Sequence, residues 1–187
     1  GPVTVIHVIA NQSTIDGEDD DPGYVDGHGT IDADTVRDLV ADPATRVVGV
    51  DPARLEQWLT TNAYRPGKRA QAFVRTGELC CTFPGCNNAV WTCDLDHTTP
   101  FDHTHPERGG ATAPRNLKPL CRFHHRIKTF THWRDFQDSL GAVVFESPTG
   151  HLFYGNAFRG TDLFPKRRAP DHPARALEVL IPLDLVG

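Results

Sequence analysis

The residues with the clearest chemical potential lie in one stretch, residues 80–129, which contains all five cysteines and five of the ten histidines of the chain. Cys81 and Cys86 follow a C-x4-C spacing, and Cys121 and His124 follow a C-x2-H spacing. Thiolate and imidazole are the ligands that structural zinc prefers, and two short ligand pairs flanking a longer insert are typical of tetrahedral zinc sites. The spacing therefore predicts one zinc site.

A second group of polar residues fills the insert and continues just past it. Its members are Asp96, His97, Asn116 and His125. The apolar alternation of residues 89–95 predicts one strand of a hairpin. The adjacent acid and imidazole of Asp96 and His97 would then be presented together at a strand end.

A helix from Cys121 to about Phe130 would use two of its faces. Cys121 and His124 would share one face at a spacing of i, i+3, while His125 would be rotated by about 100° to a neighbouring face. One helix can therefore contribute ligands to two separate metal sites.

On spacing alone, Cys80 remains an alternative to Cys81 in the zinc site.

The order Asp-His, Asn and then Cys-x-x-His-His resembles the HNH endonuclease motif of the ββα-metal superfamily, in its zinc-stabilised form. More narrowly, the strings CTFPGC, CDLDHTTP, NLKPLCRFHHRIKT and SPTGHLFY resemble a bacterial family, common in high-GC genomes, in which an HNH domain follows a domain of unknown function. The motif match covers about residues 75–155, with every motif position filled in order. Alignment with this family favours Cys81 over Cys80 as the zinc ligand.

The resemblance implies a role for each residue of the second group. Asp96 and His125 would bind a catalytic divalent ion, and His97 would be the general base. Asn116 would either complete the metal shell or brace the loop that orients His97, because HNH enzymes differ on this point.

Phosphodiester hydrolysis suits these residue types. The charge of a phosphodiester repels hydroxide, so an enzyme needs a metal ion to neutralise developing charge and a base to deprotonate water. A neutral imidazole, with an unperturbed pKa of about 6.5, suits the base role near neutral pH. Asp96 and the amide oxygen of Asn116 are hard ligands that suit Mg²⁺ or Mn²⁺, and the imidazole of His125 also tolerates Ni²⁺ or Zn²⁺.

Length and composition bound the class of protein. The 187 residues allow one domain, or one and a half, and the 39% apolar content is enough for a modest core. No run approaches the roughly 18 apolar residues of a membrane span, and the opening residues lack a signal-peptide pattern. Five cysteines without an export signal favour metal binding in a reducing compartment, so we expect a cytoplasmic protein with no membrane partner.

The net charge of −5 conceals two regions of opposite sign. Residues 16–42 contain ten acids and one base, Arg37, whereas residues 103–134 contain seven bases and one acid, Glu107. Phosphate binding requires such a positive region around the motif, so we expect DNA as the partner, with RNA as an open alternative. The candidate DNA-binding residues are Arg115, Lys118, Arg122, Arg126 and Lys128.

The whole sequence predicts an α+β protein in three parts. Residues 1–64 would hold the end of a preceding domain and an acidic linker, residues 65–160 an HNH domain with a ββα-metal core and a zinc knuckle, and residues 161–187 a Pro-rich tail. Turn and capping patterns place short N-terminal helices and a small C-terminal antiparallel meander. The helices are expected at residues 33–41, 52–61 and 66–77, and the strands of the meander at residues 133–136, 142–146 and 151–154.

Two further expectations concern the first residues. Val3–Ile9 is rich in β-branched residues and predicts a strand that belongs to a domain outside this chain, because one strand cannot form a sheet alone. The acidic, Gly-rich residues 11–29 predict a loop.

Two alternatives to a nuclease follow from the same residues. A non-catalytic, zinc-stabilised nucleic-acid-binding module would share the basic charge and the zinc, but it needs no unliganded imidazole beside a metal carboxylate. A single distorted zinc site that includes Asp96, His97 and His125 is disfavoured, because the other four ligands already complete a tetrahedron. The leading prediction is a metal-dependent HNH endonuclease or nickase of DNA, acting as a monomer or a homodimer.

Overall fold

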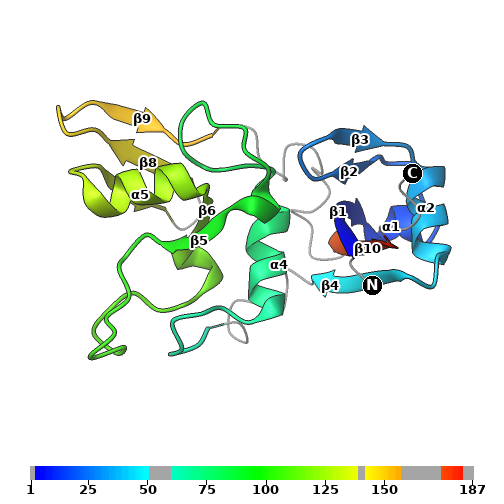
Figure 1. Cartoon of the computed structure of the whole chain (residues 1–187), viewed down its shortest axis with the longest axis horizontal. Helices are drawn as coiled ribbons and strands as arrows, with labels where there is room; N and C mark the ends of the chain where they lie inside the picture. The colour runs from blue at the N-terminus through cyan, green and yellow to red at the C-terminus, as the bar shows by residue number, and fades with distance from the viewer. Residues whose placement is uncertain (1–2, 51–59, 139–141, 157–173, 183–187) are drawn as a thin grey trace.

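The computed structural model describes residues 3–50, 60–138, 142–156 and 174–182. Within these ranges the chain has the mixed α+β structure that the sequence predicts, with three small sheets and short helices. Two lobes lie side by side, and a helix stands between them (Figure 1). No helix in the described ranges is both long enough and apolar enough to cross a membrane.

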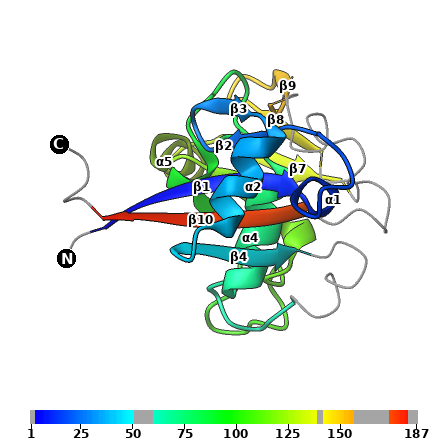
Figure 2. The ribbon, with the colours of Figure 1, turned by 90° about the vertical axis from the view of Figure 1, so that its right-hand side faces the viewer.

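The first lobe is a five-stranded antiparallel sheet with a helix on one face (Figure 2). The strand order is β3-β2-β1-β10-β4. Its elements are β1 (Val3–Asn11), α1 (Gln12–Ile15), β2 (Gly23–Val25), β3 (Gly29–Ile31), α2 (Ala33–Ala41), β4 (Thr45–Val50) and β10 (Ala174–Pro182). Asp32 caps α2, because its Oδ1 accepts a hydrogen bond of 2.8 Å from the backbone N–H of Thr35.

Side chains of β1 pack on both faces of this sheet. Val8 and Ala10 are fully buried and pack with Val36 of α2. Ile9 points to the opposite face, as the two-residue period of a strand requires, and packs with Leu79 of the second lobe. The alternation along β1 therefore builds one core within the lobe and one contact between the lobes.

The pairing of β1 with β10 corrects two expectations. β10 runs antiparallel to β1 from Asn11↔Ala174 to Val3↔Pro182, so β1 has its partner within the chain. The described part of the expected tail, residues 161–187, is a strand inside a sheet. Division of the chain at residues 64 and 160 would separate strands of one sheet. Patterns within short segments do not predict this pairing, because the two strands lie at opposite ends of the sequence.

Residues 11–29 were expected to form a loop, but they contain α1 and β2. Thr14 is fully buried, and its hydroxyl donates a hydrogen bond of 2.8 Å to Asp19. Polar side chains thus satisfy one another in this acidic segment, which composition alone does not reveal. The helix expected at residues 52–61 falls almost entirely outside the described residues.

The second lobe contains the hairpin, helix and meander that the sequence predicts. Its elements are α4 (Lys68–Gly77), the 3-10 helix η1 (Val90–Thr92), β5 (Asp94–His97), the 3-10 helix η2 (Pro114–Asn116), β6 (Leu117–Leu120), α5 (Arg122–Phe130), β7 (Arg134–Gln137), β8 (Val143–Glu146) and β9 (Leu152–Tyr154). β5 and β6 pair antiparallel, and β7, β8 and β9 form an antiparallel sheet in sequence order. The first hairpin strand is shorter than the expected 89–95 run, because residues 90–92 form η1 instead.

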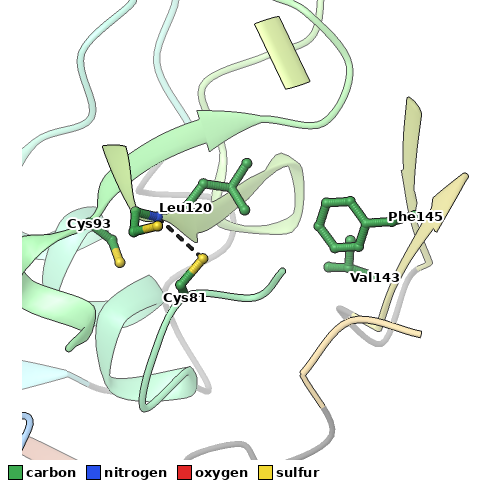
Figure 3. Packing of buried hydrophobic residues seen from close by; sticks show 6 residues of the cluster. Cys81, Cys93, Leu120, Val143 and Phe145 are labelled. Carbon is green, nitrogen blue, oxygen red and sulfur yellow. Dashed lines mark hydrogen bonds between the residues drawn. The ribbon is translucent and has the colours of Figure 1, made fainter. Parts of the chain in front are cut away.

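The core of the second lobe combines thiol groups with apolar side chains (Figure 3). Its buried members are Cys81, Cys93, Leu120, Cys121, Val143 and Phe145. Phe136 and Tyr154 of the meander are outside this core and are 54% and 81% exposed. A three-stranded sheet with one packed face leaves the side chains of its other face in solvent.

Polar and apolar contacts hold the two lobes together. The carboxylate of Asp26 in the first lobe accepts hydrogen bonds from the backbone N–H groups of Val90 (2.9 Å) and Trp91 (3.0 Å), at the start of η1. The ring of Trp91 also stacks on His7 of β1, with ring centroids 4.5 Å apart. Asp26 thereby satisfies helix-terminal N–H groups that have no partner within their own helix.

Replacement of Asp26 by Ala should destabilise the protein by about 1–3 kcal/mol, because two partly buried N–H groups at the lobe junction lose their acceptor. Urea unfolding measures this change. Asp38→Ala, on an exposed position of α2, is the matched control and should change the free energy of unfolding by less than about 0.5 kcal/mol. Equal effects of the two substitutions would contradict the assigned role of Asp26.

Candidate functional site

The predicted zinc ligands converge at the junction between the second lobe's core and the start of α5. The ligand atoms of Cys81, Cys86, Cys121 and His124 all lie within 4.8 Å of one another. His124 Nδ1 is 3.6 Å from Cys81 Sγ and 3.3 Å from Cys121 Sγ. Ligands of a tetrahedral zinc ion are roughly 3.5–3.8 Å apart, so the four side chains could bind a metal such as zinc.

The local sequence explains why these groups meet. Gly85 adopts a φ of +72°, and the N–H of Cys86 donates to the carbonyl of Phe83 (3.0 Å), so the PG turn brings Cys86 back toward Cys81. The ring of Phe83 stacks on His124 with centroids 3.9 Å apart. This stacking fixes the plane of the imidazole.

The environment of Cys81 and Cys86 by itself favours the protonated thiols. A hydrogen bond with Cys93 and burial both raise the pKa of the Cys81 thiol far above its ordinary value, and burial raises the pKa of Cys86 to about 11. A bound cation reverses this preference, because it stabilises the thiolate directly. Cys80 lies outside the cluster, and its sulfur accepts a hydrogen bond of 3.0 Å from Asn156.

Two residues of the second group, Asp96 and His125, meet where the β5–β6 hairpin packs on α5. His125 Nε2 lies 3.4 Å from Asp96 Oδ1, so the two predicted ligands of the catalytic ion face each other. The other ring nitrogen, Nδ1, lies 2.8 Å from Asp94 Oδ2. Partial burial favours the protonated form of Asp94, but hydrogen bonds with His125 and Arg122 outweigh it and lower the pKa of this carboxyl. Asp94 therefore fixes the orientation of the His125 ring and directs Nε2 toward Asp96.

His97 follows Asp96 at the end of β5 and is buried. Its Nε2 lies 2.8 Å from the hydroxyl oxygen of Thr112, and that hydroxyl donates to the carbonyl of Tyr64 (3.3 Å). The ring of Tyr64 stacks on His97 with centroids 5.4 Å apart. Burial lowers the pKa of His97 below its ordinary value of 6.5, although Asp96 acts in the opposite direction. The imidazole is therefore neutral at neutral pH.

Asn116 contacts the loop that follows His97. Its Oδ1 accepts a hydrogen bond of 2.8 Å from the N–H of Thr99, and its Nδ2 donates to the carbonyls of Thr99 (3.0 Å) and Ala111 (2.9 Å). These bonds join the beginning and the end of the 98–113 loop. Of the two roles that the resemblance implies, they match the bracing role.

Two lysines surround the other oxygen of Asp96. Lys118 Nζ lies 2.7 Å from Asp96 Oδ2 and also contacts Asp135, and its side chain is only 1% exposed. Lys128 Nζ lies 2.6 Å from the same Asp96 oxygen and 3.3 Å from Asp135. Burial opposes ionisation of Asp96, but the two ammonium groups outweigh it and lower the pKa of the carboxyl. Asp96 is therefore an ionised carboxylate in a balanced cluster of two acids and two bases.

These contacts correct part of the expected DNA-binding set. Lys118 is buried and paired, so its ammonium is not available to a phosphate backbone, because strand pairing turned it inward opposite Asp96. Arg115 is exposed beside a cavity of about 310 Å³ that Asn116 also lines. Arg122 pairs with Asp94 at 3.0 Å with its side chain 75% exposed, and Arg126 lies over the Phe130 ring.

Sequence reasoning missed three residues that shape this site: Asp94, Thr112 and Asp135. A signal existed for Asp94, because it lies two residues before Asp96 in a strand and so shares its face. No local pattern marks Thr112 or Asp135, which reach the site from a loop and from β7.

Replacement of Lys118 by Met should destabilise the protein by about 3–5 kcal/mol, because it leaves two buried carboxylates with one remaining ammonium. The measurement is urea unfolding at neutral pH. Lys68→Met, at an exposed position of α4, removes the same charge and should have an effect below about 0.5 kcal/mol. A loss for Lys118→Met no larger than that of Lys68→Met would mean that the buried cluster does not stabilise the fold.

Comparison with known proteins gives relatives without an assigned activity. The uncharacterized protein Rv3776 of Mycobacterium tuberculosis (strain ATCC 25618 / H37Rv) is 44% identical over 91 residues, which cover 48% of this chain and 16% of the relative. The uncharacterized proteins MT2160 (strain CDC 1551 / Oshkosh) and Rv2100 (strain ATCC 25618 / H37Rv) of the same species are each 34% identical over 160 residues, 81% of this chain and 28% of each relative. The chain thus spans less than a third of the length of these relatives. No protein-family model matches the chain, and no solved structure matches it.

Proposed function

We propose that this chain is a metal-dependent HNH-type endonuclease or nickase that hydrolyses DNA phosphodiester bonds. One observation carries the proposal: the β5–β6 hairpin and α5 follow one another as β, β and α, and they bring Asp96 Oδ1 and His125 Nε2 to 3.4 Å from each other, with His97 next to Asp96 at the end of β5. The non-catalytic module considered above has no need for a second pair of ligands beside a buried, neutral imidazole.

The donor set fits a divalent ion. Two ligands about 2.1 Å from an octahedral ion are roughly 3 Å apart, which is close to the separation of Asp96 Oδ1 and His125 Nε2. In the described part of the chain, the Cys81 cluster is the one group of three or more converging ligands, so this second site would rely on water and substrate oxygens as well. Mg²⁺ and Mn²⁺ suit such a site, because Mg²⁺ usually keeps several waters beside one or two carboxylates.

Asp96 and His125 would hold this ion, and Asp94 would keep His125 in the orientation that ligation needs. When bound, the ion would supply Lewis-acid polarisation of the phosphodiester and neutralise developing charge. Of the two lysines that pair with Asp96, Lys118 is buried, whereas 15% of the Lys128 side chain is exposed. Its ammonium can therefore turn toward a substrate phosphate once a cation takes over at the carboxylate.

His97 would act as the general base. The Thr112 hydroxyl donates its hydrogen to the Tyr64 carbonyl, so it accepts one from His97 Nε2, and Nδ1 carries the free lone pair. Within the described residues, Nδ1 makes no hydrogen bond. It can therefore take a proton from an attacking water, and the hydrogen bonds of Asn116 keep the following loop in the position that orients the ring.

The four-ligand cluster would hold a structural zinc ion. Cys81 and Cys86 precede the hairpin, whereas Cys121 and His124 begin α5, so one ion would fasten the hairpin to the helix. All four positions of a tetrahedron are then filled, which leaves no open position for catalysis.

Replacement of His97 by Ala should lower the rate of metal-dependent cleavage of supercoiled plasmid by about a hundredfold or more, because the base that activates water is lost. Cleavage is measured with EDTA, Mg²⁺, Mn²⁺, Ni²⁺ or Zn²⁺ added. His105→Ala removes an exposed imidazole from the neighbouring loop and should leave the rate unchanged. Full activity of His97→Ala would remove the assignment of the base. No cleavage by the unaltered protein with any metal, together with salt-sensitive DNA binding, would favour the non-catalytic module.

Metal analysis of the purified protein should give about one zinc per chain. Replacement of Cys81 by Ser should abolish this zinc and unfold the second lobe, because the apparent binding free energy of structural zinc is of order 10 kcal/mol. Cys80→Ser, which removes the adjacent thiol outside the cluster, should retain the zinc. The reverse pattern would transfer the ligand role to Cys80.

A further inference from the structure

A cavity of about 360 Å³ adjoins the candidate active site, between α4 and the β5–α5 corner. The size lies within the roughly 300–1,000 Å³ of small-molecule sites. Residues from three separate parts of the sequence line it: the segment before α4, α4 itself, and the corner that carries the proposed metal ligands. Those on which the argument rests are Tyr64, Arg65, Gln71, Arg75, Arg122 and His125.

The lining is cationic. Arg75 is held by neutral acceptors, because its guanidinium donates to Gln71 Oε1 (2.9 Å) and to the carbonyl of Cys93 (3.1 Å). Its Nε is buried without a hydrogen-bond partner. In the ranges that the structure describes, neither Arg75 nor Arg65 is in ion-pair contact with a carboxylate, and Arg122 shares Asp94 with His125. Three arginines therefore line this cavity together with one carboxylate residue, Asp94.

The cavity touches both halves of the proposed catalytic machinery. His125 and its partner Asp94 form part of the wall. Tyr64 forms another part, and its ring stacks on His97. A group bound in this cavity would therefore lie beside the proposed metal ligand His125 and against Tyr64, the residue that stacks on the proposed general base.

We propose that this cavity binds the phosphodiester next to the one that is hydrolysed, with its phosphate on the guanidinium groups and its sugar against the ring of Tyr64; this rests on the proposed function. Guanidinium groups recognise phosphate through paired hydrogen bonds, and an aromatic ring offers a flat apolar surface to a nucleotide. The cavity thereby holds the substrate strand in register with His97. It identifies the segment of residues 64–75 as part of the DNA-binding surface, which the basic 103–134 region alone does not include.

The test measures binding without hydrolysis, by fluorescence anisotropy of a short labelled DNA duplex with no Mg²⁺ or Mn²⁺ added and no chelator present, so that structural zinc is retained. The double variant Arg65→Gln/Arg122→Gln removes two charges from the cavity. The matched double variant Arg46→Gln/Arg134→Gln removes two exposed charges from β4 and β7 at positions that do not line it. We expect about a tenfold or greater weakening of Kd for the first and less than about threefold for the second. For the first variant, the slope of log K against log[salt] should become less negative by about one to two.

Tyr64→Phe and Tyr64→Leu test the aromatic wall in the same assay. The ring-preserving Phe variant should bind as the unaltered protein does, and the Leu variant should bind several-fold more weakly. Equal losses for the two arginine double variants would overturn the proposal, because they would indicate diffuse attraction by all surface charge. No measurable binding by the unaltered protein would overturn it as well.

The two proposals fail in different ways. Selective loss of binding in the cavity variant, without cleavage of plasmid by the unaltered protein, would support the cavity and remove the hydrolytic function. Cleavage of plasmid that depends on His97, with equal binding by the two double variants, would support hydrolysis and remove the cavity.

Discussion

The buried ammonium of Lys118 is the constraint on which the arrangement of the candidate site depends. Lys118 lies directly opposite Asp96 in the β5–β6 ladder, and β7 contributes Asp135 on its other side. An ammonium that is 1% exposed costs several kcal/mol unless carboxylates compensate its charge, so the hairpin and β7 must meet in this one register. The same contact keeps Asp96 ionised and turns its remaining oxygen toward His125.

Polar contacts also determine the position of α5. No residue of this helix is fully buried, so apolar packing contributes little to holding it against the hairpin. Its start is tied to the thiol cluster through Cys121 and His124, and its far end reaches Asp96 through Lys128. His124 and His125 are consecutive, and the rotation of about 100° between them directs one imidazole to each cluster. Displacement of the thiol cluster would therefore move His125 away from Asp96, which couples stability to the proposed chemistry.

Local patterns predicted the parts of this protein that local physics determines. The helices α2, α4 and α5, the hairpin, the meander and the Cys/His spacing are all properties of short segments. The pairing of β1 with β10 depends on residues at opposite ends of the sequence, and the burial of Lys118 depends on which residue lies across the ladder. A charge count cannot distinguish such a lysine from one on the surface. Arg75 is a similar case, because its neutral partners become visible only once α4 packs beside Cys93.

The position of α4 connects the first lobe with the candidate site. Phe73 and Ala72 pack with Val48 of β4 and with Trp91, while Gln71 and Arg75 lie one turn apart toward the cavity. A rotation of the first lobe against the second would therefore shift the α4 wall of the cavity relative to the α5 wall that carries His125. Asp26 and the stacking of His7 on Trp91 oppose such a rotation. The first lobe thus acts on the proposed substrate surface through the helix between the lobes, although the described parts of its own sheet contribute no residue to that surface.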